Sequence, residues 1–230
     1  MTIQETERYL SAGFPGWELM TDNQRESIAR ETQEMCYEKG TYVHNGEENC
    51  IGAVLVVRGT LRVFMLSDEG REVTLYRIRA GSMCVLSASC VLAHIHFAVH
   101  VDASEDTTAL IVPASFFLSL CAENVRVESA AYKLIAERFS EVMWTMQQLL
   151  FTSFDKRLAQ FLIEEAAGAP DGVLHMTHEE VAKLTGSARE VVTRMLNYFA
   201  AEGAVELSRG GIRIADKKKL EAFARKAARS

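Results

Sequence analysis

The spacing of apolar residues divides this chain into three segments. Over 34–114, short apolar runs alternate with glycine-containing turns, which is typical of antiparallel strands joined by hairpins. Over 123–153, apolar residues recur every three or four positions, which predicts one long helix. We therefore expect an α+β fold, with a β-roll over 1–122, a long helix over 123–153 and a smaller domain of short helices over 154–230.

Glycine marks the predicted turns of the roll. These turns lie at 38–40, 45–46, 58–59, 68–70 and 80–81. A closed antiparallel shell encloses space, so its interior is a candidate ligand pocket. Before the roll, residues 1–32 are expected to form irregular structure and short helix, with Phe14, Pro15 and Trp17 as an apolar plug.

The long helix carries more apolar side chains than one face requires. Leu134, Met143, Trp144 and Leu150 lie outside its heptad seam. Burial on two sides predicts a second copy of the helix as partner, and hence a symmetric dimer. The alternative is a helix that folds back on its own domain. The predicted dimer seam consists of Tyr132, Ile135, Phe139, Val142, Met146 and Leu149.

Two short helices meet at a tight turn within 176–199. Thr177 precedes Glu180 by three residues, and Ser187 precedes Glu190 by three, so each pair fits a capping box at a helix start. Gly186 lies between the pairs and can adopt the left-handed conformation of a helix C-cap. The spacing predicts a helix-turn-helix.

The second of these helices has two distinct faces. Val192, Met195, Leu196 and Phe199 recur at helical spacing and are expected to be buried. The opposite face is polar and suits a DNA major groove, because Arg can bridge guanine O6 and N7 and Glu can accept from a cytosine amino group. The alternative is a solvated face with an ion pair between side chains four residues apart. The polar face consists of Arg189, Glu190, Thr193, Arg194 and Asn197.

A glycine-rich hairpin is predicted over 205–214, as in a winged helix, with Arg209 at its tip and able to meet a phosphate. The distribution of charge along the chain also favours a nucleic-acid partner. Residues 176–230 hold 11 Lys/Arg against 7 Asp/Glu, whereas residues 1–175 hold 14 against 24. A basic end on a chain of net charge −6 favours double-stranded DNA as the partner.

Composition and the N-terminal sequence narrow the class of protein further. No apolar run reaches the roughly 18 residues that span a bilayer, and the N-terminus is too polar and acidic for a signal peptide. We therefore expect a soluble cytoplasmic protein with no membrane partner. Five cysteines without compact spacing argue against a disulfide framework.

Taken together, these motifs resemble the CRP/FNR family of bacterial transcription regulators over nearly the whole chain. The resemblance implies a cyclic-nucleotide-binding-like jelly roll, a dimerisation helix and a winged helix-turn-helix. It also implies a homodimer, with duplex DNA and RNA polymerase as partners. The resemblance is carried by Gly40, Thr41, Asn45, Gly46, Glu47, Gly59, 68–72, Gly81, 155–159, 177–182 and 186–196.

By this resemblance, Arg189, Glu190 and Arg194 occupy base-reading positions, and the implied target is a palindrome with TGTGA-like half-sites. Ala188 departs from the family, which usually has a polar residue there. The complete predicted DNA-binding set is Thr177, Ser187, Arg189, Glu190, Thr193, Arg194 and Arg209.

We expect the effector to differ from that of the cyclic AMP branch. Leu86 stands near the family's ribose-binding Glu and His96 near its phosphate-binding Arg. Without that guanidinium a phosphodiester loses its bidentate partner, so we predict no cyclic AMP binding. No cysteine precedes Cys36, so the N-terminal iron–sulfur cluster of the oxygen-sensing branch is not expected either.

Histidines and cysteines in the same segment allow a metal, haem or redox hypothesis. The candidate effector residues are Cys84, Leu86, Cys90, His94 and His96, with His100 on the same strand face. The alternative is that the histidines are the solvated side of a strand and the thiols small core residues. The candidate effectors are therefore a small molecule, haem or a metal.

Three classes of function compete. A cupin-like metalloenzyme would use the histidine strand, but no carboxylate accompanies the histidines before Asp102, and no nucleophile–base motif appears elsewhere. A protein-binding module would use the same helix pair without DNA. We favour an effector-responsive DNA-binding regulator that has no catalytic residues.

Overall fold

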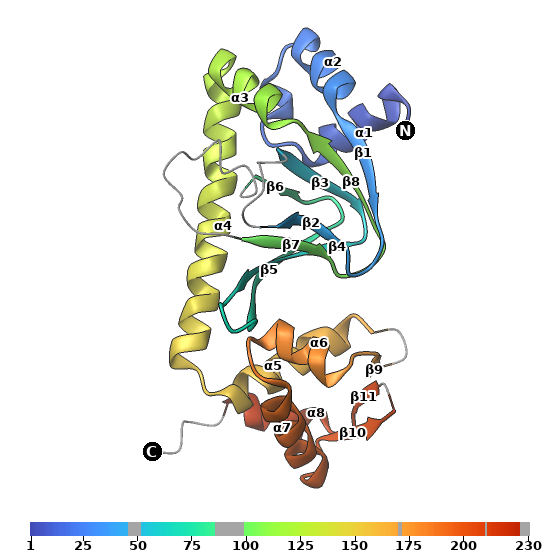
Figure 1. The fold of residues 1–230 in the computed structure, drawn as a ribbon, viewed down its shortest axis with the longest axis vertical. Coiled ribbons are helices and arrows are strands. Elements are labelled where there is room, and N and C mark those ends of the chain that lie inside the picture. Colours follow the sequence, from blue (N-terminus) through green and yellow to red (C-terminus); the bar gives the residue numbers. More distant parts are fainter. Residues whose placement is uncertain (46–51, 86–98, 170–171, 210, 226–230) are drawn as a thin grey trace. The chain divides into compact units, whose positions relative to one another are not determined.

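The computed structural model describes residues 1–45, 52–85, 99–169, 172–209 and 211–225 (Figure 1). The chain forms two compact units. The first contains Met1–Met65 and Leu75–Met143, and the second contains Leu66–Thr74 and Trp144–Ser230. Among the described residues, no helix combines the length and the apolar character that a membrane span requires.

The N-terminus is more helical than the sequence predicted. Helix α1 (Ile3–Gly13) and helix α2 (Asp22–Glu31) each begin with a complete capping box, and a 3-10 turn (Trp17–Leu19) lies between them. The predicted apolar plug is confirmed for Phe14 and Trp17, which are buried.

Two four-stranded sheets form the roll, and they face each other in Figure 1. One has the order β1-β8-β3-β6 and the other β2-β7-β4-β5. The strand pairs are antiparallel, which confirms the predicted α+β architecture. The strands are β1 (Gln33–Tyr37), β2 (Tyr42–Asn45), β3 (Ala53–Arg58), β4 (Thr60–Leu66), β5 (Glu72–Arg79), β6 (Met83–Cys84), β7 (His100–Ala103) and β8 (Thr107–Val112).

Both faces of β3 are buried, because successive side chains of a strand point to opposite sides. Val54 and Val56 belong to a core that includes Leu61 and Val63 of the other sheet. Leu55 belongs to a second core with helices α1, α2, α3 (Ala114–Glu123) and α4 (Val125–Phe151). This two-sided packing explains why β3 reads as a continuous apolar run.

Helix α4 runs from Val125 to Phe151, within the predicted range 123–153, and its apolar residues occupy two faces. Ile135 and Val142 are half-buried against the cores of their own chain. By contrast, Tyr132, Phe139 and Met146 are 51%, 62% and 46% exposed. The residues of the predicted seam therefore do not share one face of the helix: some pack on their own chain and others are exposed. The three exposed residues fall on one heptad stripe with Ala136, Met143 and Leu150, which are also exposed. The stripe, hereafter the α4 stripe, consists of Tyr132, Ala136, Phe139, Met143, Met146 and Leu150.

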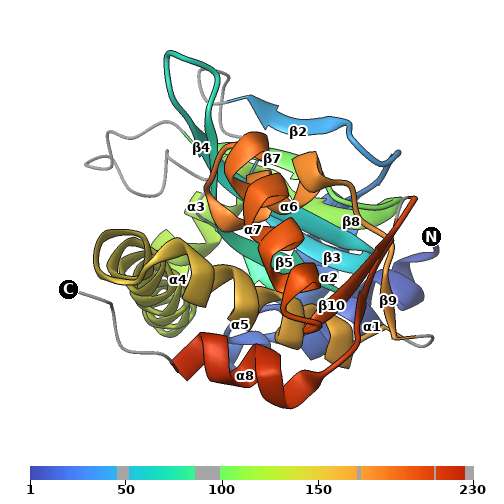
Figure 2. The same cartoon turned by 90° about the horizontal axis from the view of Figure 1, so that it is seen from below.

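Short helices and a small sheet build most of the second unit. Figure 2 shows helix α8 lying against helix α5. Their shared core includes Leu158, Leu196, Phe199 and Leu220. The elements are α5 (Phe154–Ala167), β9 (Val173–Leu174), α6 (His178–Thr185), α7 (Arg189–Ala201), β10 (Val205–Ser208), β11 (Gly211–Ile214) and α8 (Lys217–Arg225).

Ser153 occupies the N-cap position of α5, and Asp155 lies in the first turn of the helix. A carboxylate in the first turn interacts favourably with the positive end of the helix dipole.

Candidate nucleic-acid interface

The start of α6 and the turn after it follow the sequence prediction. Glu180 N donates to Thr177 Oγ1 at 3.1 Å, and Thr177 N donates to Glu180 Oε2 at 2.8 Å, so the first capping box is confirmed. Gly186 ends α6 with φ 63° and ψ 43°, the left-handed conformation that favours glycine. A Cβ at Gly186 would lie 3.0 Å from Leu149 Cδ2, which adds a steric reason for glycine.

The prediction of a second capping box, between Ser187 and Glu190, was wrong. Helix α7 begins at Arg189, its N-cap is Ala188, and no side chain caps it. Ser187 belongs to the turn instead, because its backbone N–H donates to Ala182 O at 3.0 Å. This shift places Glu190 at the second helical position, where a reciprocal box with Ser187 cannot form.

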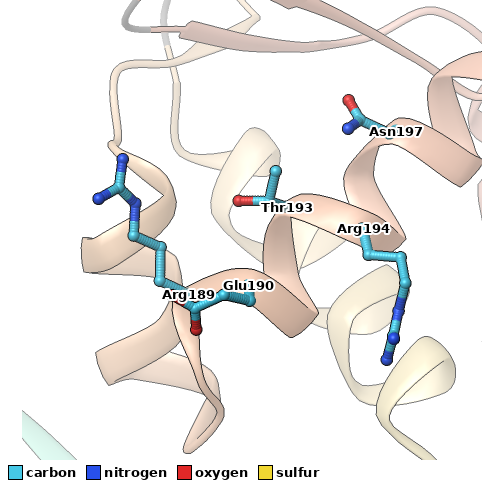
Figure 3. Close-up of a pocket in the computed structure, with 5 residues that line it drawn as sticks. All are labelled: Arg189, Glu190, Thr193, Arg194 and Asn197. Atoms are coloured by element: carbon cyan, nitrogen blue, oxygen red, sulfur yellow. The ribbon is translucent and has the colours of Figure 1, made fainter.

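The two faces of α7 are confirmed. Val192, Leu196 and Phe199 are fully buried, and Met195 is partly buried against the same core. The opposite face forms a shallow hollow, hereafter the α7 hollow, lined by Arg189, Glu190, Thr193, Arg194 and Asn197 (Figure 3).

Charges in the α7 hollow are not neutralised by one another. Arg189, Glu190 and Arg194 are exposed. In Figure 3 the two guanidiniums extend in different directions. Among the described residues, no ion pair joins Glu190 to Arg194, so the four-residue pair that sequence spacing allowed is not formed. Their hydrogen-bonding groups therefore face solvent.

A second hollow lies between the start of α6 and the predicted wing. Strands β10 and β11 pair with Val205 opposite Ile214 and Ser208 opposite Gly211, which confirms the hairpin. Arg209 is exposed at its tip. Arg189 lines both hollows and so joins the two surfaces. The hollow is lined by Met176, Thr177, His178, Glu179, Arg189, Ser208, Gly211 and Ile212.

A hydrogen bond between α6 and α7 was not predicted from the sequence. His178 Nδ1 and Thr193 Oγ1 are 2.9 Å apart, and both residues are half-buried. The hydrogen bond joins the first residue of α6 to the centre of the α7 hollow. Since fifteen residues separate the partners, no local spacing rule indicates the pair.

The hairpin tip over 66–74 also contacts α6 within the second unit. Thr74 Oγ1 donates to Lys183 O at 2.9 Å, and Lys183 Nζ pairs with Glu72 Oε1 at 2.9 Å. The Arg71 guanidinium donates to Gly186 O at 2.5 Å. The bonds from Thr74 and Arg71 satisfy carbonyl groups at the C-terminal end of α6, which a helix leaves unpaired.

Most candidate effector residues lie outside the described residues: Leu86, Cys90, His94 and His96. Cys84 is buried on β6, and its Sγ lies 3.4 Å from Tyr76 Oη. Burial, and secondarily the nearby thiol of Cys84, raises the pKa of Tyr76 well above its ordinary value. His100 Nδ1 lies 3.0 Å from Asn45 Oδ1. Within the described part of the chain, no three His, Cys, Asp or Glu side chains are grouped to hold a metal.

The described thiols are not paired with one another. Cys36 is exposed, whereas Cys84 and Cys121 are buried. Burial raises the pKa of Cys121 to about 11, because a thiolate is poorly solvated there. At neutral pH, Cys121 is therefore a protonated core residue, while Cys50 and Cys90 lie outside the described residues.

A buried ion pair in the roll was also not predicted. Arg62 on β4 donates through Nε to Asp102 Oδ1 at 3.0 Å and through Nη2 to Asp102 Oδ2 at 2.5 Å. Their side chains are 6% and 15% exposed. The Arg62 guanidinium also lies 4.1 Å from the ring centroid of Phe64.

Comparison with known proteins matches both halves of this architecture. The family model of the cyclic nucleotide-binding domain matches residues 34–124, and that of the Crp-like helix-turn-helix domain matches residues 156–223. A helix-turn-helix of this type binds DNA, and the models and relatives describe transcription regulators rather than enzymes.

Individual relatives agree with the domain matches. A CRP/FNR regulator of known structure from Eubacterium rectale is 43% identical, with a TM-score of 0.89 that covers 95% of this chain and 100% of that one. A CooA variant from Carboxydothermus hydrogenoformans is 26% identical, with a TM-score of 0.63 over 85% of this chain and 88% of that one. The cyclic AMP receptor protein of Thermus thermophilus is 28% identical over 170 residues, 74% of this chain and 78% of that protein.

The fold and the exposed polar helix define a DNA-binding transcription regulator with an N-terminal cyclic-nucleotide-binding-type domain. The chain belongs to the CRP/FNR family.

Proposed function

We propose that the protein acts as a homodimer that reads a palindromic duplex with TGTGA-like half-sites through Arg189, Glu190 and Arg194. The observation that carries this proposal is the α7 hollow, in which two guanidiniums and one carboxylate are exposed without pairing to each other. Arg recognises guanine and Glu recognises the amino group of cytosine in the major groove, so these side chains suit G·C pairs of the half-site.

The α4 stripe supports the homodimer. Its large side chains remain 46–70% exposed in the single chain, and they repeat with the three-and-four spacing of a coiled-coil seam. Contiguous apolar surface of this kind typically marks an interface. A twofold axis along the stripe would duplicate the α7 hollow, as a palindrome requires.

The effector proposal concerns the roll. We propose a signal other than cyclic AMP, either a different small molecule or a metal, haem or redox change in the segment that contains Cys84 and His96. The sequence supports this proposal, because Leu86 and His96 replace the family's ribose-binding Glu and phosphate-binding Arg. RNA polymerase is the proposed downstream partner.

Titration with cyclic AMP in a calorimeter is expected to give no binding in the micromolar range. A phosphodiester buried without a guanidinium partner loses a bidentate charge-assisted hydrogen bond. The cyclic AMP receptor protein of Thermus thermophilus is a suitable positive control. Micromolar affinity for this chain would contradict the effector proposal and leave the DNA proposal intact.

Arg189→Ala is expected to cost about 1–3 kcal/mol per half-site on the specific duplex, or about 5- to 150-fold in affinity. On random DNA the change should be small, because a base contact does not contribute there. Fluorescence anisotropy with both duplexes measures the two constants.

The matched control is Arg209→Ala at the wing tip, which should weaken both duplexes alike if it loses only a phosphate contact. Equal losses from Arg189→Ala on both duplexes would mean that Arg189 does not read bases. A protein-binding module is separated by the salt dependence, since phosphate contacts give a steep slope of affinity against salt.

A further inference from the structure

We infer that Thr193 determines specificity for thymine: its methyl group meets the C5-methyl of a thymine in each half-site, while His178 holds its hydroxyl. This inference rests on the proposed DNA reading and assigns the residue its chemical target. It follows from the hydrogen bond between α6 and α7 and from the composition of the α7 hollow.

His178 is well placed to fix the Thr193 side chain. It is the first residue of α6 and lies within the capping box that joins Thr177 to Glu180, so its backbone is held at the helix start. Its Nδ1 lies 2.9 Å from Thr193 Oγ1. In Figure 3 the hydroxyl oxygen of Thr193 points away from Arg194, and the methyl group projects in another direction.

This bond selects one side-chain rotamer. A threonine in a helix otherwise divides between two χ1 rotamers, because its hydroxyl can bond a carbonyl of the preceding turn. With Oγ1 bonded to His178, the staggered geometry fixes the methyl group at one position. The imidazole tautomer decides which partner donates, but either tautomer occupies the hydroxyl and leaves the methyl group unengaged.

The surroundings give that methyl group a role. Thr193 lies between Glu190 and Asn197 along the face, and the other four residues that line the α7 hollow end in charged or amide groups. The Thr193 methyl is therefore the one terminal apolar group on this surface. In the major groove only thymine presents a methyl group, and a threonine methyl is one of its known partners.

Replacement of thymine by uracil isolates this contact. Duplex sites are first selected with the wild-type protein, and each thymine of the selected half-site is then replaced singly by deoxyuridine, which removes only the C5-methyl. We expect one position per half-site at which uracil weakens binding by roughly fourfold, the value of one buried methyl-sized group.

Two matched variants test the residue. Thr193→Ser keeps the hydroxyl but lacks the methyl, so the affinity ratio of the thymine duplex to the uracil duplex should fall to about one. Thr193→Val carries a methyl group at both γ positions, so it should retain the ratio although its bond to His178 is lost. Retention by Val also shows that α7 remains folded.

His178 is tested by the same ratio. His178→Ala should lower the ratio, because Thr193 then divides between two rotamers. His178→Asn places an amide near the position of Nδ1 and should restore it. A phosphate contact of His178 would affect the thymine and uracil duplexes equally and so would cancel in the ratio.

Two results would overturn the inference. One is a selected site at which no thymine is sensitive to uracil; the other is a Thr193→Ser variant that keeps the wild-type ratio. Either result leaves specific DNA binding in place and so affects only the role of Thr193. Failure of the wild-type protein to select any duplex would instead overturn the proposed function, and this inference with it.

Discussion

The double substitution Phe139→Glu and Met146→Glu is expected to convert the protein to monomers and to lower its affinity for a palindromic duplex by about 10²- to 10⁴-fold. Both side chains are exposed in the single chain, at 62% and 46%, so the substitution should cost the fold little. At a twofold interface it would bury four carboxylates without partners, which is strongly unfavourable. Loss of the second copy then removes the bivalent gain in DNA affinity.

Sedimentation velocity and anisotropy on a single half-site and on a full palindrome provide the measurements. The control is Phe139→Leu with Met146→Leu, which keeps the α4 stripe apolar and should preserve both the dimer and the affinity. The half-site affinity of the charged variant should be nearly unchanged. A charged variant that stays dimeric would show that the α4 stripe is not the interface.

Asp102→Ala is expected to lower the free energy of unfolding of the first unit by about 3–5 kcal/mol, because removing one partner leaves the other charge buried. Arg62 is the charge left behind, with its side chain only 6% exposed. Urea unfolding followed by circular dichroism measures the change. The midpoint should shift, whereas the denaturant slope should remain constant if the unfolding stays two-state.

The double substitution Arg62→Leu with Asp102→Leu is the informative control for that experiment. A buried ion pair replaced by apolar side chains of similar volume is often neutral or stabilising. The double variant should therefore be more stable than Asp102→Ala. If the double variant were less stable than the wild-type protein, the ion pair itself would contribute net free energy to the fold.

Local spacing in the sequence was sufficient for much of the DNA-binding unit. The capping box at Thr177 requires only residues three positions apart, and Gly186 is the residue that a left-handed helix end favours. The two faces of α7 follow from a helical repeat with few ambiguous positions. Such features depend on the nearest turn of the chain, so the sequence alone indicates them.

Competition between neighbouring elements limited the prediction at Ser187. Its spacing to Glu190 fits a capping box, but the Ser187 backbone N–H belongs to the C-terminal turn of α6, where it donates to Ala182 O. On α4, apolar residues occur around much of the helix, so periodicity alone could not separate the residues that pack on the same chain from those of the α4 stripe. That separation depends on tertiary packing.

Contacts between distant residues were beyond the reach of a single sequence. Arg62 and Asp102 are 40 residues apart, and His178 and Thr193 are 15 apart. Each pair forms only after strand register or helix packing has brought its members together. The TGTGA-like half-site was a further expectation that came from the resemblance and not from local spacing.

Helix α7 starts without a side-chain cap, and this has an energetic consequence for binding of the proposed DNA partner. Ala188 has no side-chain oxygen, whereas a Ser, Asp or Asn at an N-cap typically stabilises a helix by about 1 kcal/mol. The chain lacks that stabilisation at the end that carries Arg189 and Glu190. Backbone N–H groups that lack an acceptor at a helix start attract anions. In the proposed complex, a backbone phosphate would supply the missing acceptor, and the nucleic acid would complete the helix that reads it.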